Sequence, residues 1–332
     1  MDAKLLAYLN YLLLSLKLRV HYGLGFIRSA GNTLLAFNYR RSVTMGKCPK
    51  CSKFRKIDAH LFELASFCTV LDNVADFKDE EEDALVSTVT IGEWLKLAAQ
   101  LDNVVIDTWK FTDGAEFFCE TVADACDSDT KHYSAYSTAL TKFIFVSNAL
   151  EEMYRFISPH YLSSDKVKNK KLRKPSMQAT ALVDIYEEDD FPLYFKHKVE
   201  NFIEAFNCCD YIKDKPLGGM KNVKLEDNSY ALHLIRNIRN YVAHGVFPIS
   251  ENPEWTSDYL AHQALYEVLL SSCRLACLYI QVFLNKYNTG MQSDDYRLTM
   301  QGVGSEFDYF RENCTPDLAL KVHLSDTFSF LD

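Results

Sequence analysis

The sequence predicts a mainly α-helical protein, and three observations support this prediction. Apolar residues recur at three- and four-residue steps over residues 133–156 and again over residues 228–244. Two capping boxes, Thr90-Ile-Gly-Glu93 and Asp113-Gly-Ala-Glu116, precede apolar runs. Hydrophobic residues make up 48% of the 332 residues, which is ample for a core. We therefore expect a four-helix bundle in the C-terminal half and an additional, mostly helical N-terminal region.

The N-terminal region, residues 1–127, begins with an apolar run from Leu5 to Leu16. Asn10 interrupts this run and Lys17 ends it, so it is too short to span a bilayer. We expect a buried helix here and no membrane partner. Residues 20–50 give only a weak strand-pair signal, the acidic run at 79–83 marks a surface break, and a helix should follow each capping box. We expect this region to regulate or sense.

A second unit should begin at Asp127-Ser-Asp-Thr130 and cover residues 128–290. We expect its four helices near residues 133–156, 193–212, 228–244 and 256–287, with an inserted loop after the first. Asn228 or Ser229 can cap the third helix. The loop at 246–254 lies beside His244 and should shape access to it. Residues 291–332 form a C-terminal extension that we expect to pack across a partner protomer.

The net charge of −9 argues against a broadly basic nucleic-acid surface, so any RNA contact must depend on a local patch. One basic run lies in the inserted loop, and Pro175 ends it. It consists of Lys166, Lys168, Lys170, Lys171, Arg173 and Lys174. The run is either a segment that follows an RNA backbone or a solvated linker.

The third helix of the second unit carries the most informative string, Arg236-Asn-Ile-Arg239-Asn240-Tyr-Val-Ala-His244-Gly245. Its apolar residues form a core face. At roughly 100° per residue, His233, Arg236, Asn240 and His244 fall within about 80° of one another on the opposite face, with Arg239 beyond its edge. Gly245 can supply the left-handed stop that ends the helix at His244.

The spacing Arg-x4-His occurs three times, whereas 12 arginines and 9 histidines in 332 residues predict about 0.3 matches by chance. Arg55 and His60 follow a cysteine pair. Arg155 and His160 flank a proline at a point where the helix would have to continue. Only the third match, Arg239 and His244, combines an asparagine after the arginine, an apolar face before it and a glycine after the histidine.

This string resembles the signature of the HEPN superfamily, compact all-α domains that cleave RNA with an arginine, a following polar residue and a histidine. The resemblance implies that Arg239, Asn240 and His244 are catalytic. It also implies a homodimer with one composite, metal-independent site, and a role as a toxin or antiviral-defence effector, with a regulatory partner or antitoxin left open. Val246 stands where one toxin subgroup has a tyrosine. Four further side chains are candidates for a supporting role at this site: Arg236, His233, Glu151 and Asn148.

These residue types suit cleavage of RNA by its own 2′-OH group. A histidine that titrates near neutral pH can move protons, and a permanently charged, forked arginine can stabilise the crowded phosphate. Two His244 side chains across a two-fold axis could act as base and acid. The competing hypothesis is a non-catalytic HEPN-like module that binds RNA, nucleotide or protein. A third reading makes Arg239, Asn240 and His244 purely structural.

The ten cysteines come without a secretory cleavage pattern, so we expect reduced thiols and a cytoplasmic protein. Cys48-Pro-Lys-Cys51 is half of a zinc knuckle, which His60 and Cys68 could complete, although a plain reduced turn is the stronger reading. We therefore expect no cofactor in cleavage and keep a structural zinc as the alternative. Walker, Rossmann, nucleophile-elbow and HExxH motifs are absent from the sequence, which argues against those enzyme classes.

Overall fold

A computed structural model describes residues 48–78, 83–111, 119–164, 172–255, 259–291 and 306–331. The chain divides into two units, Met1–Cys48 and Pro49–Asp332, and Cys48 is the only described residue of the first. The predictions for the N-terminal apolar run, for the capping box at Asp113 and for Lys166, Lys168, Lys170 and Lys171 lie outside the described residues.

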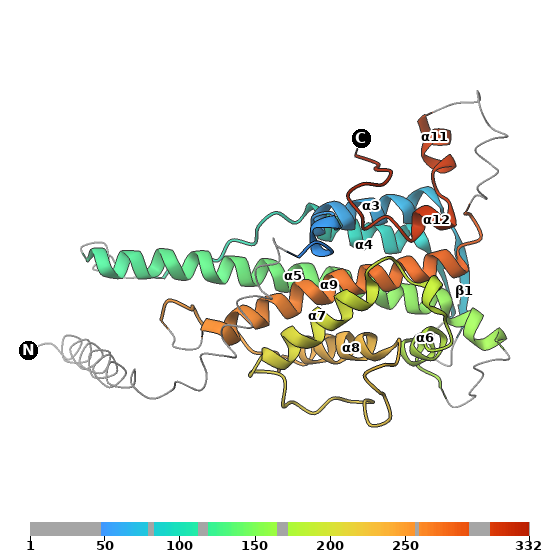
Figure 1. The fold of residues 1–332 in the computed structure, drawn as a ribbon. Helices are drawn as coiled ribbons and strands as arrows, with labels where there is room; N and C mark the ends of the chain where they lie inside the picture. Colours follow the sequence, from blue (N-terminus) through green and yellow to red (C-terminus); the bar gives the residue numbers. More distant parts are fainter. Residues whose placement is uncertain are drawn as a thin grey trace, which may run out of the picture. The chain divides into compact units, whose positions relative to one another are not determined.

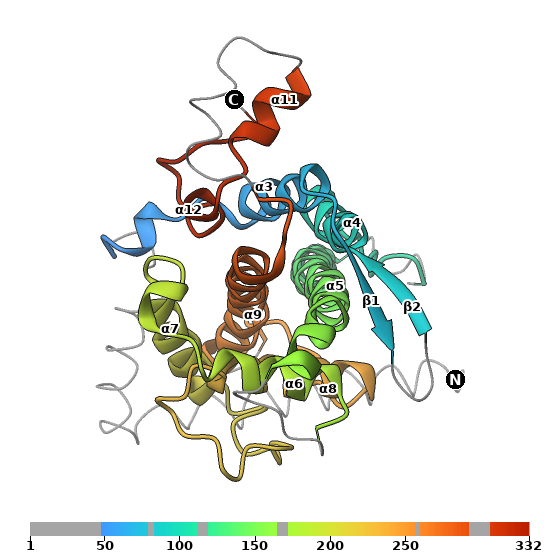
Figure 2. The same cartoon turned by 90° about the vertical axis from the view of Figure 1, so that its right-hand side faces the viewer.

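The unit Pro49–Asp332 is mainly helical, as predicted, and its helices form three layers (Figures 1 and 2). The middle layer contains α5 (Glu120–Ser163) and α9 (Tyr259–Tyr287). On one side lie α3 (Ile57–Val70) and α4 (Thr88–Gln100). On the other lie α6 (Pro175–Val183), α7 (Phe195–Cys208) and α8 (Tyr230–Ala243).

Short elements complete the unit. The strands β1 (Val74–Lys78) and β2 (Asp83–Ser87) form an antiparallel hairpin in which Val74 pairs with Ser87, and β1 packs against α5. The remaining pieces are η2 (Cys51–Lys53), η4 (Glu188–Asp190), α11 (Glu306–Glu312) and α12 (Pro316–Ala319). The hairpin leads directly into α4.

The helix α9 is the centre of the hydrophobic core. Tyr279 and Phe283 of α9 are fully buried, as are Phe143 and Phe156 of α5 and Phe202 of α7. Within the described residues, the segment His262–Tyr287 is long and apolar enough to cross a membrane, but 78% of its most apolar window is buried inside the protein. That burial is the pattern of a core helix, because every side of it contacts another helix.

The start of α4 differs from the predicted capping box. The helix begins at Thr88, two residues before Thr90, and its N-cap is Ser87, whose Oγ accepts a hydrogen bond from the backbone N–H of Val89 at 3.0 Å. The box at Thr90-Ile-Gly-Glu93 therefore lies inside the helix and does not start it. The hairpin decides the boundary, because β2 ends at Ser87 and leaves this serine in extended backbone geometry.

The helix α5 is longer than predicted at both ends. It runs without a break through residues 127–130, where we expected a new unit to begin, and the residues on both sides belong to the unit Pro49–Asp332. The expectation that Pro159 interrupts the helix is wrong, because α5 continues to Ser163. Proline removes one backbone hydrogen bond, and burial of Ile157 and Tyr161 on either side holds the last turn in place.

The helix α6 stands where the sequence suggested a continuing loop. Pro175 takes its first position, where the missing N–H has no helical partner to lose. Its buried face combines Ala179, Leu182 and Val183 with the polar Gln178 and Thr180. Nine residues with such a mixed face give little apolar periodicity, which explains why the pattern missed this helix.

The described part of the C-terminal extension, residues 306–331, packs against its own chain, and its packing across a partner protomer stays a prediction. Arg55, just before α3, donates to the backbone oxygens of Leu324 at 2.6 Å and Thr327 at 2.8 Å. Glu63 of α3 accepts from the backbone N–H of Phe330 at 2.8 Å. Arg55 and Glu63 also form a buried ion pair at 3.0 Å, which ties the tail to α3.

Candidate functional site

The helix α8 ends as the sequence predicted. Gly245 adopts a left-handed φ of 66°, and the N–H of Val246 donates to the oxygen of Tyr241 at 2.9 Å. Together with the bond from Gly245 N–H to the oxygen of Val242, this is a Schellman motif, and it leaves His244 as the C-cap. The start differs, because the side chain of Ser229 donates to Asp184 and does not cap α8.

A pocket of about 550 Å³ opens beside the middle of α8. It is bounded by α8, by one face of α5, by the start of α6 and by the turn that contains Gly218. Its lining residues are Glu151, Lys174, Pro175, Ser176, Met177, Gly218, Arg236, Arg239 and Asn240. Three cationic side chains and a single carboxylate line this space, so the pocket carries a net positive charge in a chain of net charge −9.

Arg236 is the best-held cation of this pocket. One guanidinium nitrogen donates to the backbone oxygen of Gly218 at 2.9 Å, and another contacts the sulfur of Met177. Burial lowers the pKa of Arg236, while nearby Tyr154 and Glu151 act in the opposite direction. Gly219 allows this arrangement, because a Cβ at that position would lie 2.5 Å from the guanidinium, and its φ is +78°.

Arg239 lies between the pocket and a carboxylate of α5. Its Nε is 3.7 Å from Oε1 of Glu151, and its Nη1 is 3.4 Å from Oδ1 of Asn240. Burial raises the pKa of Glu151, and Arg239 and Arg236 counteract that rise. Arg239 remains 40% exposed at its side chain, so it can turn toward a ligand in the pocket.

His244 does not line this pocket. It is exposed at the end of α8, one helical turn beyond Asn240, whose backbone oxygen accepts the N–H of His244 at 2.9 Å. The structure therefore brings Arg239 and Asn240 together and leaves His244 at the outer end of the same helix face. A ligand that contacts all three must extend from the pocket toward the surface.

The structure corrects the prediction that His233 belongs to the accessible polar face of α8. It is only 4% exposed, and burial, with Arg236 nearby, lowers its pKa to about 4. Its Nδ1 is a buried atom for which no hydrogen-bond partner is found. The turn at Gly218 contacts Arg236 and Asn237, one helical turn further along α8, so other residues of the chain also pack on this face of the helix. Asn148 is half-buried on α5 and is not among the lining residues.

Asn237 is a residue of this site that the sequence did not reveal. Its side-chain oxygen accepts from the backbone N–H of Gly218 at 2.7 Å, and its amide nitrogen donates to the backbone oxygens of Gly218 and His233. This buried amide fixes the turn that in turn holds Arg236. The available signal was an asparagine three residues after Leu234 and directly before Ile238, next to the apolar face of the predicted helix, where an amide needs hydrogen-bond partners.

The other two Arg-x4-His matches have structural surroundings. Arg55 holds the C-terminal tail, and His60 is buried in the core, where it contacts Gln281 at 2.8 Å. Arg155 pairs with Glu152 at 2.8 Å, and His160 stacks on the ring of Tyr287.

The structure does not bring together the four residues Cys48, Cys51, His60 and Cys68 that the sequence offered for a zinc site. His60 and Cys68 are both completely buried inside the helical layers. A ring nitrogen of His197, on α7, lies instead beside the sulfurs of Cys48 and Cys51, and the three ligand atoms are within 4.8 Å of one another. The ten cysteines all belong to the described residues, and none of them forms a disulfide.

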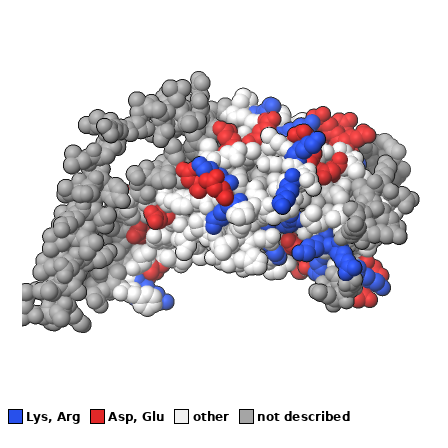
Figure 3. All heavy atoms as spheres, turned by 90° about the horizontal axis from the view of Figure 1, so that it is seen from below, with Lys and Arg blue, Asp and Glu red and all other residues white. Residues whose placement is uncertain are grey.

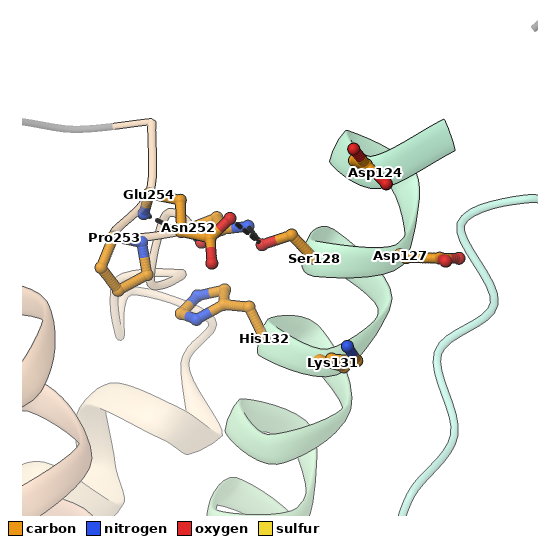
Figure 4. A pocket seen from close by; sticks show the side chains of 8 residues that line it. All are labelled: Asp124, Asp127, Ser128, Lys131, His132, Asn252, Pro253 and Glu254. Atoms are coloured by element: carbon orange, nitrogen blue, oxygen red, sulfur yellow. Dashed lines mark hydrogen bonds between the residues drawn. The ribbon is translucent and has the colours of Figure 1, made fainter. Parts of the chain in front are cut away.

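A second pocket lies at the other end of the unit, between α5 and the loop after α8 (Figure 4). Figure 4 shows Asn252 and Glu254 of this loop facing Ser128 of α5. Ser128 donates to Glu254 at 2.6 Å and accepts from Asn252 at 2.8 Å. Asp124 and Asp127 add further negative charge, so this pocket suits a phosphate poorly. The loop is thus fastened to α5 and does not cover the pocket of Arg236.

The charges are spread over the face that carries α6 and α8. Figure 3 shows Lys and Arg side chains there in separate groups, with Asp and Glu among them. Of the predicted basic run, Arg173 and Lys174 are described and exposed, and Lys174 reaches the pocket lining. A local contact with an anion is therefore supported better than a broad nucleic-acid surface.

Comparison with known proteins gives no assignment: no protein-family model, no curated protein and no solved structure matches this chain.

Proposed function

We propose that this protein is a metal-independent endoribonuclease whose site is completed by a second copy of the chain. The observation that carries the proposal is the cationic pocket along α8, where Arg236, Arg239 and Lys174 surround a space next to Asn240 and one turn from His244. The resemblance of the α8 sequence to the signature of HEPN ribonucleases supports the same function. The ten cysteines without disulfides fit a reducing cytoplasm.

The residues divide the chemistry between them. Arg236 and Lys174 hold the phosphate backbone, and Arg239 leaves Glu151 to stabilise the charge that develops on the reacting phosphate. His244 takes the proton of the 2′-OH. The second protomer supplies the histidine that protonates the leaving 5′-oxygen, because one exposed histidine cannot do both at the same time. Cleavage then leaves a 2′,3′-cyclic phosphate and a 5′-OH.

The second candidate is a module that binds RNA or a nucleotide without cleaving it. The observation in its favour is the position of His244 outside the pocket, together with the pairing of Arg239 and Glu151. In this reading the cations bind phosphate and the histidine is a surface residue.

Separate measurements of binding and cleavage test the proposal. We expect His244→Ala to bind a labelled single-stranded RNA within about twofold of the native protein and to lose at least about 100-fold in cleavage rate. Arg236→Ala should lose binding by about tenfold or more, because it removes a partly buried cation. His160→Ala is the matched control, since it belongs to another Arg-x4-His match and should keep both activities. Native protein that binds without cleaving would establish the module; cleavage unchanged in His244→Ala would exclude the proposed site.

A further inference from the structure

We propose that Cys48, Cys51 and His197 bind one zinc ion, which joins the segment before α3 to the start of α7. The three ligand atoms lie within 4.8 Å of one another, and all three residues are half-buried. Two thiolates and an imidazole are a donor set that selects zinc over magnesium or calcium, which prefer oxygen ligands. This site shares no residue with the pocket of Arg236.

The distances fit a tetrahedral ion. Zinc–sulfur bonds of about 2.3 Å and zinc–nitrogen bonds of about 2.05 Å place a sulfur and a nitrogen about 3.5 Å apart, and two sulfurs about 3.8 Å apart. The sulfur of Cys51 lies 3.4 Å from Nε2 of His197, which is one edge of such a tetrahedron. Closing the remaining edges from 4.8 Å or less requires only side-chain rotation.

Both sides of the site are fixed before a metal arrives. Cys51 opens the helical turn η2, and Lys53 at its end accepts a backbone bond from Ser325 at 3.0 Å. On the other side, Tyr194 precedes α7 with a left-handed φ of 66°, a conformation that a bulky residue keeps only where its surroundings impose it. This turn sets His197 on the first turn of α7, beside Cys51. The blue segment leading into α3 lies beside α7 in Figure 2.

The surroundings of Cys51 suit a thiolate. Nζ of Lys198 is 3.5 Å and Nδ2 of Asn201 is 3.6 Å from its sulfur, so two N–H donors approach the atom that would carry negative charge. Lys198 is itself held over the ring of Phe54 at 4.5 Å. Such donors around a metal ligand orient it and raise metal affinity.

Three ligands of the ion come from the described residues. Among the described residues, no fourth cysteine, histidine or carboxylate joins this group. Zinc with two thiolates is neutral overall, so the nearby lysine does not repel the loaded site. Because Cys51 and His197 are 146 positions apart, the metal closes a long loop and should stabilise the folded chain.

The test uses the full-length protein, purified under reducing conditions, loaded with zinc and dialysed against metal-free buffer. We expect one zinc per chain by elemental analysis, and a higher Tm with zinc than after chelation. Cys51→Ser and His197→Gln should lose the metal. The matched controls are Cys119→Ser, at an exposed cysteine outside the group, and His244→Ala at the proposed cleavage site, and both should keep one zinc.

Cobalt substitution of the native chain keeps the test independent of how the variants fold. Bound cobalt should show thiolate charge-transfer bands and the visible absorption of tetrahedral coordination. Zinc below a tenth of an equivalent in the native chain would overturn the proposal, as would retention of zinc by His197→Gln or oxidation of the Cys48–Cys51 pair to a disulfide under zinc loading. Since metal content is measured without RNA, a failed ribonuclease assay leaves this result unaffected.

Discussion

Among the described residues, burial sets several histidines apart from His244. His233 and His323 are buried, and burial lowers the pKa of each to about 4, while His60 is lowered well below 6.5 for the same reason. His244 is exposed at the end of α8. Spacing along a helix could identify His244 as accessible. It could not show that His233 is shielded, because that burial depends on how the rest of the chain packs around α8.

The buried histidines predict an acid-sensitive fold. As the pH falls below 6.5, these histidines bind protons in the unfolded chain, whereas in the folded chain they bind protons only near pH 4. Their contribution to the free energy of unfolding should therefore be fully present above pH 6.5 and decrease between pH 6.5 and 4. Each histidine contributes a slope of up to about 1.4 kcal/mol per pH unit. Urea unfolding at several pH values should show a shallower decrease for His233→Leu. A decrease that is as steep in His233→Leu as in the native protein would contradict this assignment.

Disrupting the ion pair between Arg55 and Glu63 should cause one of the largest losses in the free energy of unfolding that a single substitution can produce. The side chains are 8% and 2% exposed, so Glu63→Ala leaves a buried guanidinium without its partner and should lower the free energy of unfolding by about 3–5 kcal/mol. Asp326→Ala breaks an exposed pair with Lys53 and should change it by less than about 1 kcal/mol. Denaturant titration measures both, and similar values would show that the tail is not held by this pair.

The helices show which elements a sequence pattern can find. The apolar repeat of α8 and its terminal glycine predicted the helix and its Schellman end. Short α6 was missed because its buried face includes Gln178 and Thr180. The pocket depends on α6 and on the Gly218 turn, so sequence could supply Arg239, Asn240 and Glu151 but not the hydrogen bonds of Asn237. His197 was equally out of reach, because its neighbour Cys51 is 146 positions away.

The cap of α4 offers a direct comparison between pattern and structure. Ser87→Ala removes the acceptor for the N–H of Val89 and should reduce the free energy of unfolding by about 1 kcal/mol. Thr90→Val, at the start of the predicted box, should leave it within about 0.5 kcal/mol, because Thr90 lies inside the helix. Thermal and urea unfolding measure the difference. A larger loss for Thr90→Val would favour the predicted box.

The effect of a substitution at the end of α8 should depend on backbone conformation and not on side-chain packing. A Cβ at Gly245 meets nothing within 4 Å, so Gly245→Ala is penalised only by its φ of +66°. We expect a loss of about 1–2 kcal/mol in the free energy of unfolding for alanine and a smaller loss for asparagine, which tolerates this conformation better. Equal losses for the two variants would mean that the left-handed end is not maintained in solution.

For the whole molecule, the central question is whether two copies make one site. A single protomer holds Arg239 and Asn240 together but leaves His244 at the surface end of α8. We therefore expect cleavage activity per protomer to fall on dilution, in parallel with the dimer fraction measured by light scattering. Activity per protomer that stays constant while the protein becomes monomeric would exclude a composite site.

The most direct measurement is the chemistry of the RNA ends. Native protein, His244→Ala and His160→Ala are incubated with a labelled RNA in excess EDTA, and the products are analysed by mass spectrometry. We predict 2′,3′-cyclic phosphate and 5′-OH ends from the native protein and from His160→Ala, and intact RNA from His244→Ala. Products ending in 3′-OH, or the same cyclic-phosphate yield from His244→Ala, would contradict a metal-independent ribonuclease site on α8.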